Sequence, residues 1–155
     1  HKMAAGLSVA RDQLEPAMER LSELLEKQGS GNLGPRDLRL DGVLMASAAS
    51  VELIQKIEAA GPFGAGAPAP RFVFPDQQIR FSKRVGASHL KISFGDAPSG
   101  PIDAIAFGAF DGPLGPAIEA HGGKRFHLAG RLEINTWAGR SRAQLRLEDA
   151  AVSGE

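Results

Sequence analysis

Apolar residues recur at helical spacing in the first part of the chain. Residues 12–28 place leucine and methionine on one side of a helix, behind an acidic capping box, and predict an amphipathic helix. Three leucines between residues 38 and 44 suggest a short strand. Ser50 is the expected N-cap of a second helix, which Gly61 and the following proline end. The first 60 residues therefore predict two helices and a short strand.

From Ile79 the period of the apolar residues changes to two, which is the spacing of β-strands. The expected elements are strands at 78–85, 89–95 and 102–108, a short helix at 113–121, and strands at 125–137 and 141–148. Strand, strand, strand, helix, strand, strand is the order of an OB-fold, a five-stranded Greek-key barrel. The predicted fold class is α+β, mainly β, with this barrel preceded by the two helices and the short strand.

Composition narrows the class of protein. Hydrophobic residues make up 43% of the chain, enough for a folded core, and the 19 glycines and 10 prolines favour turns over an all-helical fold. The absence of cysteine excludes disulfides and thiolate metal sites. No apolar run approaches the roughly 20 residues that span a membrane, so we expect a cytoplasmic protein without membrane contact.

The charges are distributed unevenly, although the formal net charge is zero. Residues 71–147 carry 11 Lys and Arg against 6 Asp and Glu, whereas residues 1–70 carry 7 against 9. A basic segment of this kind is the usual footprint of a polyanionic partner. An ordinary solvated surface would show the same excess, so charge alone leaves both interpretations open.

Strand alternation assigns the basic residues to one face. Side chains of a strand point alternately to opposite faces, and four of the predicted strands place cations opposite their apolar residues. Single-strand binders combine cations for the phosphates with an exposed aromatic side chain for the bases. The candidate DNA-binding residues are Arg84, His89, Lys91, Arg131, Trp137, Arg140, Arg142 and Arg146. Alternatively, Trp137 covers a barrel edge and the arginines keep the outer surface solvated.

The sequence shows no catalytic centre. The four histidines stand in unlike contexts, and none has a metal-ligand spacing. The glycines after Phe63 lack the Lys-Ser/Thr of a phosphate-binding loop, and no serine has the flanking glycines of a nucleophile elbow. We therefore expect a chain without a catalytic residue, metal site or cofactor of its own.

Several motifs, taken in order, resemble those of the RecJ exonucleases. The opening His1-Lys2-Met3-Ala4-Ala5-Gly6-Leu7 is similar to the end of the Gly-Gly-His motif in the DHH-associated domain of DHH phosphoesterases. The stretch from Pro62 to Pro70 resembles the Pro-Phe-Gly-x-Gly-Asn-Pro-x-Pro signature of RecJ exonucleases, with Ala67 in place of the usual Asn. His89-Leu90-Lys91, Asp103–Gly108, Leu132–Gly139 and Gln144-Leu145 match the C-terminal barrel of that family.

The resemblance implies a fragment of a longer enzyme. Residues 1–30 would be the C-terminal end of the DHH-associated domain, and residues 37–152 an OB-fold domain whose strand-helix extension spans 37–60. The family degrades single-stranded DNA from 5′ to 3′ in recombination and repair. It uses Mn²⁺ or Mg²⁺ held by a DHH domain that should precede residue 1. His1 would be a remnant of the motif that contacts substrate.

The implied role of this chain is to bind single-stranded DNA for that catalytic domain. Two alternatives remain open at this point. The basic face could dock the acidic tail of a single-strand-binding protein, because either partner is anionic. The domain could also be structural and only close the ring of the longer enzyme.

Overall fold

The structure, a computed structural model, describes residues 13–27 and 38–154. The chain divides into two compact units, residues 1–38 and 39–155. In the first unit, helix α1 (Leu14–Lys27) lies within the helix predicted over 12–28. Its predicted acidic cap lies outside the described residues. No helix in the described ranges is long and apolar enough to cross a membrane.

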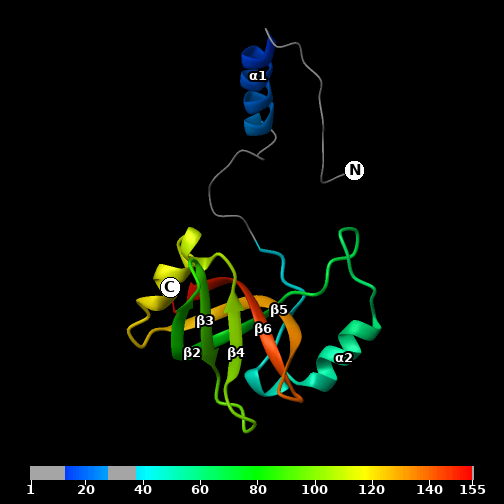
Figure 1. The fold of residues 1–155 in the computed structure, drawn as a ribbon, viewed down its shortest axis with the longest axis vertical. Helices are drawn as coiled ribbons and strands as arrows, with labels where there is room; N and C mark the ends of the chain where they lie inside the picture. Colours follow the sequence, from blue (N-terminus) through cyan, green and yellow to red (C-terminus); the bar gives the residue numbers. More distant parts are fainter. Residues whose placement is uncertain (1–12, 28–37, 155) are drawn as a thin grey trace. The chain divides into compact units, whose positions relative to one another are not determined.

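The second unit contains a closed β-barrel (Figure 1). Its strands are β2 (Phe72–Val85), β3 (His89–Phe94), β4 (Ile102–Ala106), β5 (Arg125–Trp137) and β6 (Arg140–Val152). They pair in the order β2-β3-β4-β6-β5, and β5 pairs again with β2 to close the barrel. Only β4 and β6 run parallel within it, and helix α3 (Leu114–Glu119) follows β4 in the chain. The predicted five-stranded OB-fold is confirmed.

A strand-helix extension precedes the barrel. Strand β1 (Gly42–Val43) pairs in parallel with the start of β2, and helix α2 (Val51–Ala59) follows it. The helix begins where the sequence predicts, because the Ser50 hydroxyl accepts a hydrogen bond of 3.1 Å from the backbone N–H of Leu53. Strand pairing therefore joins β1 to the barrel, and the Ser50 cap fixes the start of α2.

Alternate apolar residues of the last two strands fill the core of the barrel. Phe126 and Leu128 of β5, and Leu145 and Leu147 of β6, are all buried. Phe74 and Phe94 meet edge to face inside the barrel, with ring centroids 5.4 Å apart. The core cluster consists of Phe74, Ile79, Leu90, Ile92, Phe94, Ile102, Ala104, Ala106, Ala109, Ile118, Phe126, Leu128, Leu145 and Leu147.

Strand β2 differs from its prediction in length and in phase. It begins at Phe72 rather than at residue 78, and its first half pairs with β5 while its second half pairs with β3. A bulge between Ile79 and Phe81 shifts the alternation by one residue. Directly opposed residues of an antiparallel pair share a face, so Arg84 lies on the same face as the buried Leu90, although its own side chain is exposed. The register therefore does not place Arg84 on the face of Lys91, where the alternation predicted it.

Candidate nucleic-acid interface

A groove of about 980 Å³ lies where three parts of the second unit meet. Its walls are the β5–β6 hairpin, the connection from Ser99 to Asp103 at the start of β4, and the N-terminal end of α2. Four of the eight candidate DNA-binding residues line this groove: Lys91, Trp137, Arg140 and Arg142. Strands β3, β5 and β6 bring these four residues together, whereas the other four candidates lie outside the groove.

The β5–β6 hairpin presents Trp137 to solvent. Its two-residue turn has positive φ at both Ala138 (50°) and Gly139 (76°), the backbone of a type I′ turn that keeps the strands closely paired. Trp137 lies opposite Arg140 at the last pair before the turn and is 80% exposed. An indole this exposed covers no barrel edge, so that interpretation of Trp137 is wrong. The side chain is available for stacking.

Two arginines of the groove have no acidic partner among the described residues. In the part of the chain that the structure describes, Arg140 and Arg142 form no ion pair and no side-chain hydrogen bond. Lys91 lies 3.5 Å from an Asp103 oxygen, and both side chains are about half exposed, so this pair contributes little stability. Asp103 and Glu52 are the acids that line the groove. The two free guanidiniums therefore lie beside the exposed indole.

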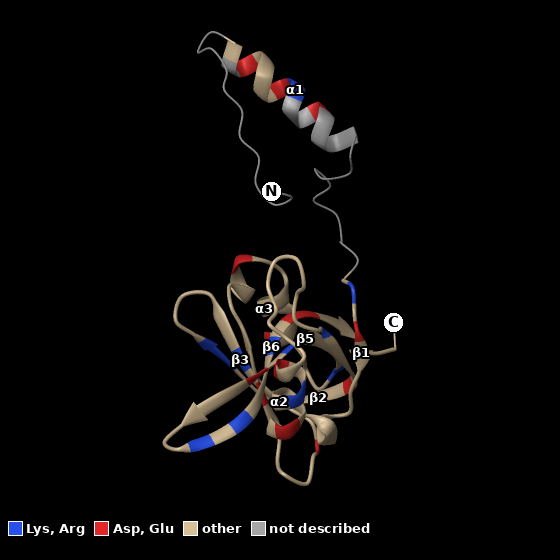
Figure 2. Ribbon diagram, turned by 90° about the vertical axis from the view of Figure 1, so that its right-hand side faces the viewer, with Lys and Arg blue, Asp and Glu red and all other residues tan. Residues whose placement is uncertain are grey.

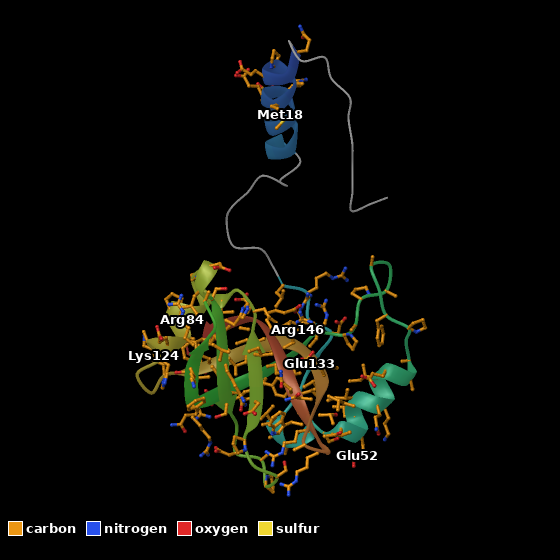
Figure 3. All side chains as sticks on the ribbon, viewed as in Figure 1. Met18, Glu52, Arg84, Lys124, Glu133 and Arg146 are labelled. Atoms are coloured by element: carbon orange, nitrogen blue, oxygen red, sulfur yellow. The ribbon has the colours of Figure 1, made fainter. Side chains whose placement is uncertain are left out.

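Three further candidates gather around two phenylalanines rather than in the groove. The Arg146 guanidinium lies over Phe107 at 4.9 Å from the ring centroid, and His89 meets the same ring edge to face at 5.2 Å. Arg84 lies over Phe110 at 4.4 Å and donates two hydrogen bonds to the Ala87 carbonyl. These contacts hold the exposed Arg84 side chain against its own hairpin, and Arg146 and Phe107 are exposed as well. Figure 3 labels Arg84 and Arg146 among the side chains of the barrel.

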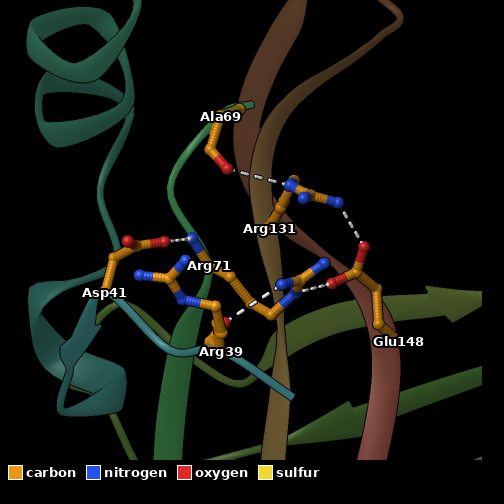
Figure 4. A network of polar contacts seen from close by, with 6 residues as sticks. All are labelled: Arg39, Asp41, Ala69, Arg71, Arg131 and Glu148. Atoms are coloured by element: carbon orange, nitrogen blue, oxygen red, sulfur yellow. Dashed lines mark hydrogen bonds and ion pairs between the residues drawn. The ribbon is translucent and has the colours of Figure 1, made fainter. Parts of the chain in front are cut away.

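The last candidate, Arg131, belongs to a structural network (Figure 4). Its guanidinium pairs with Glu148 and donates a hydrogen bond of 2.9 Å to the Ala69 carbonyl. Glu148 also pairs with Arg71, whose backbone N–H donates to Asp41 at 2.8 Å. The hydrogen bond to Glu148 raises the pKa of Arg71 above its ordinary value, against the opposing effect of desolvation. Arg131 thus connects β5, β6 and the loop before β2, and lies outside the groove.

Lys83 is a cation that the alternation missed. The bulge in β2 places it opposite Lys91 on the outer face, and its side chain is exposed. Two like charges in directly opposed positions repel each other, and a bound anion would relieve that repulsion. A bulge at Ile79 leaves no clear mark in the sequence, so the period-two pattern alone could not have found this residue. Figure 2 marks the Lys and Arg positions on the ribbon.

No metal centre is present among residues 13–27 and 38–154, where no three His, Asp or Glu side chains are close enough to hold an ion. His121 and His127 accept hydrogen bonds from backbone N–H groups, as does His89 from Gly108 at 3.0 Å. These histidines stabilise turns. His1 lies outside the described residues, so its predicted substrate contact stays a prediction.

Comparison with known proteins places the barrel in a family. The RecJ OB domain family matches residues 40–149. The chain is 33% identical over 152 residues to the single-stranded-DNA-specific exonuclease RecJ of Salmonella typhimurium, and 32% identical over 152 residues to that of Escherichia coli. The RecJ of Bacillus subtilis is 28% identical over 159 residues. These alignments cover 96%, 96% and 99% of this chain but 25%, 25% and 19% of the relatives, so the chain spans a quarter of their length or less. With the family match extending over most of the barrel strands and the extension, this chain belongs to the RecJ OB domain family.

Proposed function

We propose that this domain binds single-stranded DNA in the groove beneath the β5–β6 hairpin. The observation that carries the proposal is Trp137, 80% exposed at the groove beside Arg140 and Arg142, which have no acidic partner within residues 38–154. Bases stack on an exposed indole whatever their identity, and guanidiniums bind phosphates without reading sequence. In this proposal Trp137 stacks on a base, while Arg140, Arg142 and Lys91 contact the backbone.

The geometry favours a single strand over a duplex. A duplex keeps its bases stacked on one another, so their faces are closed to a side chain unless the helix is opened. The indole gains most when it meets an unpaired base, and the outer strands and loops of OB-folds are suited to this kind of binding. Removing a stacking aromatic side chain typically costs about 1–3 kcal/mol of binding free energy per base.

In this proposal the domain serves a longer exonuclease. The relatives are named as single-stranded-DNA-specific exonucleases, and the chain matches a quarter of their length or less. The strand held here would lead to a catalytic domain outside this sequence. Mn²⁺ or Mg²⁺, the expected cofactor of that domain, would bind there too, since the described residues offer no metal centre of their own.

The test is fluorescence anisotropy with a labelled oligothymidine and a matched duplex, at low and at moderate salt. We expect tighter binding to the single strand, weaker binding at higher salt, and a loss of about 1–3 kcal/mol in Trp137→Ala. Trp137 is the one tryptophan of the sequence, so quenching of its fluorescence by DNA reports contact at this position directly. Phe63→Ala, on an exposed phenylalanine outside the groove, is the matched control.

Three outcomes would contradict the proposal. Equal affinity for duplex and single strand, with unchanged Trp137 fluorescence, would show that the groove does not stack on bases. Displacement of DNA by an acidic peptide at low concentration would instead favour a protein-docking role for the same cations. Normal exonuclease activity of the longer enzyme after charge reversal at Arg142 and Arg146 would favour a structural role.

A further inference from the structure

We infer that Phe107, with the Arg146 guanidinium over its ring, is a second base-stacking platform and that one strand of DNA runs along β6 between it and Trp137. This inference rests on the proposed function and adds a site that the sequence pattern did not indicate. Phe107 directly follows β4 in an apolar stretch, where a phenylalanine is normally expected in the core.

Phe107 is exposed but held in place. Its side chain is 56% exposed, although most large apolar residues of this barrel are buried. His89 contacts the ring edge to face, and the same imidazole accepts a hydrogen bond of 3.0 Å from the N–H of Gly108, the next residue. The ring therefore has little freedom to lose on binding, which lowers the entropic cost of stacking on it.

A hollow of about 420 Å³ lies beside the ring and is within the usual range for small-ligand sites. Phe107, Pro113 and Leu114 line it with apolar surface, and Arg146 adds a cation. Glu148 also lines it, but both of its carboxylate oxygens pair with arginines of the network in Figure 4. The local charge therefore favours an anionic ligand with a flat apolar part, which describes a nucleotide of single-stranded DNA.

The strand pairing connects this hollow to the groove. Gln144 lines the groove and lies opposite Asp103 of β4. Arg146 is two residues further along β6, so it lies on the same face as Gln144, opposite Ile105 of β4. Trp137 lies opposite Arg140 at the other end of β6. The six residue-to-residue steps from Arg140 to Arg146 span about 20 Å at the rise of a β-strand. A stacked strand rises about 3.4 Å per nucleotide, so about six nucleotides would connect the platforms.

The experiment compares dT2 and dT12 binding to the wild-type chain, Phe107→Ala, Trp137→Ala and the double variant. With dT12 we expect each single variant to weaken binding by about 5- to 150-fold, and the double variant to lose the product of the two factors. With dT2, too short to reach both rings, each single variant should keep the weak site at its remaining ring, and the double variant should lose both sites. Quenching of Trp137 fluorescence by dT12 should persist in Phe107→Ala at saturating DNA.

Controls separate stacking from folding and from the proposed function. Phe107→Leu keeps an apolar side chain and should fold normally yet still lose dT12 affinity, whereas Phe107→Trp should retain it. Wild-type affinity for dT12 in Phe107→Ala and Phe107→Leu, with Trp137→Ala still impaired, would overturn the second platform and leave the groove intact. Absence of any binding by the wild-type chain would overturn both proposals. Loss of acidic-peptide binding, without loss of DNA binding, in the Phe107 variants would assign the hollow to a protein partner instead.

Discussion

Arg131 and Arg142 lie on neighbouring strands, and the sequence pattern assigned both to phosphate binding. The structure gives them different surroundings. Arg131 pairs with Glu148 and donates to the Ala69 carbonyl, and only 30% of its side chain is exposed. Arg142 is exposed and has no such partner within residues 38–154. We therefore predict that Arg131→Ala lowers the stability of the fold, while Arg142→Ala lowers DNA affinity.

The magnitude for Arg131→Ala follows from the contacts that are lost. Hydrogen bonds to charged groups contribute about 1.5–3 kcal/mol each. Partial exposure reduces that contribution for the two bonds of Arg131, to Glu148 and to the Ala69 carbonyl. Glu148 keeps Arg71 as a partner, so no unpaired charge is left behind. We expect the free energy of unfolding to fall by about 2 kcal/mol, which lowers Tm by roughly 8 °C for a domain of this size. Arg142→Ala should change the free energy of unfolding by less than about 0.5 kcal/mol.

The assay combines thermal unfolding, followed by circular dichroism, with oligothymidine binding over a range of salt concentrations. Each phosphate contact on a single strand contributes about −0.7 to the slope of log K against log salt. Arg142→Ala should therefore make the slope shallower by about 0.7, and Arg131→Ala should leave it unchanged. A normal Tm together with a shallower slope in Arg131→Ala would refute the assignment of Arg131 to the network.

Three further predictions concern the barrel and its extension. Gly130→Ala should destabilise the fold by about 3 kcal/mol in urea unfolding, because the added methyl group would overlap a carbonyl oxygen of β6, whereas Gly64→Ala, with open space around it, should be neutral. A hydrogen bond from Ser153, and then the guanidinium of Arg125, lower the pKa of Asp76 in the folded state. Asp76 should therefore stabilise the fold above pH 3.8 and lose that effect as the pH falls further. Asp76→Asn should make the acid limb of a pH–stability curve shallower; an unchanged limb would contradict this cause. Ser50→Ala should cost about 1 kcal/mol through the loss of the α2 cap, measured as a shift in the urea midpoint at constant m.

Much of the architecture was predictable because it depends on local patterns. Period-two alternation, with glycine at the turns, was enough to predict the five barrel strands, although not the first half of β2. The hairpin turn at Ala138 and Gly139 placed Trp137 at a strand end, away from the core positions of β5. For these elements, each residue's position follows from its near neighbours along the chain.

The tertiary structure alone decided which of the predicted residues act together. The bulge near Ile79 reverses the alternation and exchanges the positions expected of Arg84 and Lys83, because strand register depends on pairing with β3 rather than on local sequence. Arg131 is assigned to the network by Ala69 and Glu148, which lie 62 and 17 residues away in sequence. The exposure of Phe107 likewise depends on which strands pack around it. Periodicity predicts the face on which a side chain lies, but its partners are set by contacts between distant segments, which only the folded barrel brings together.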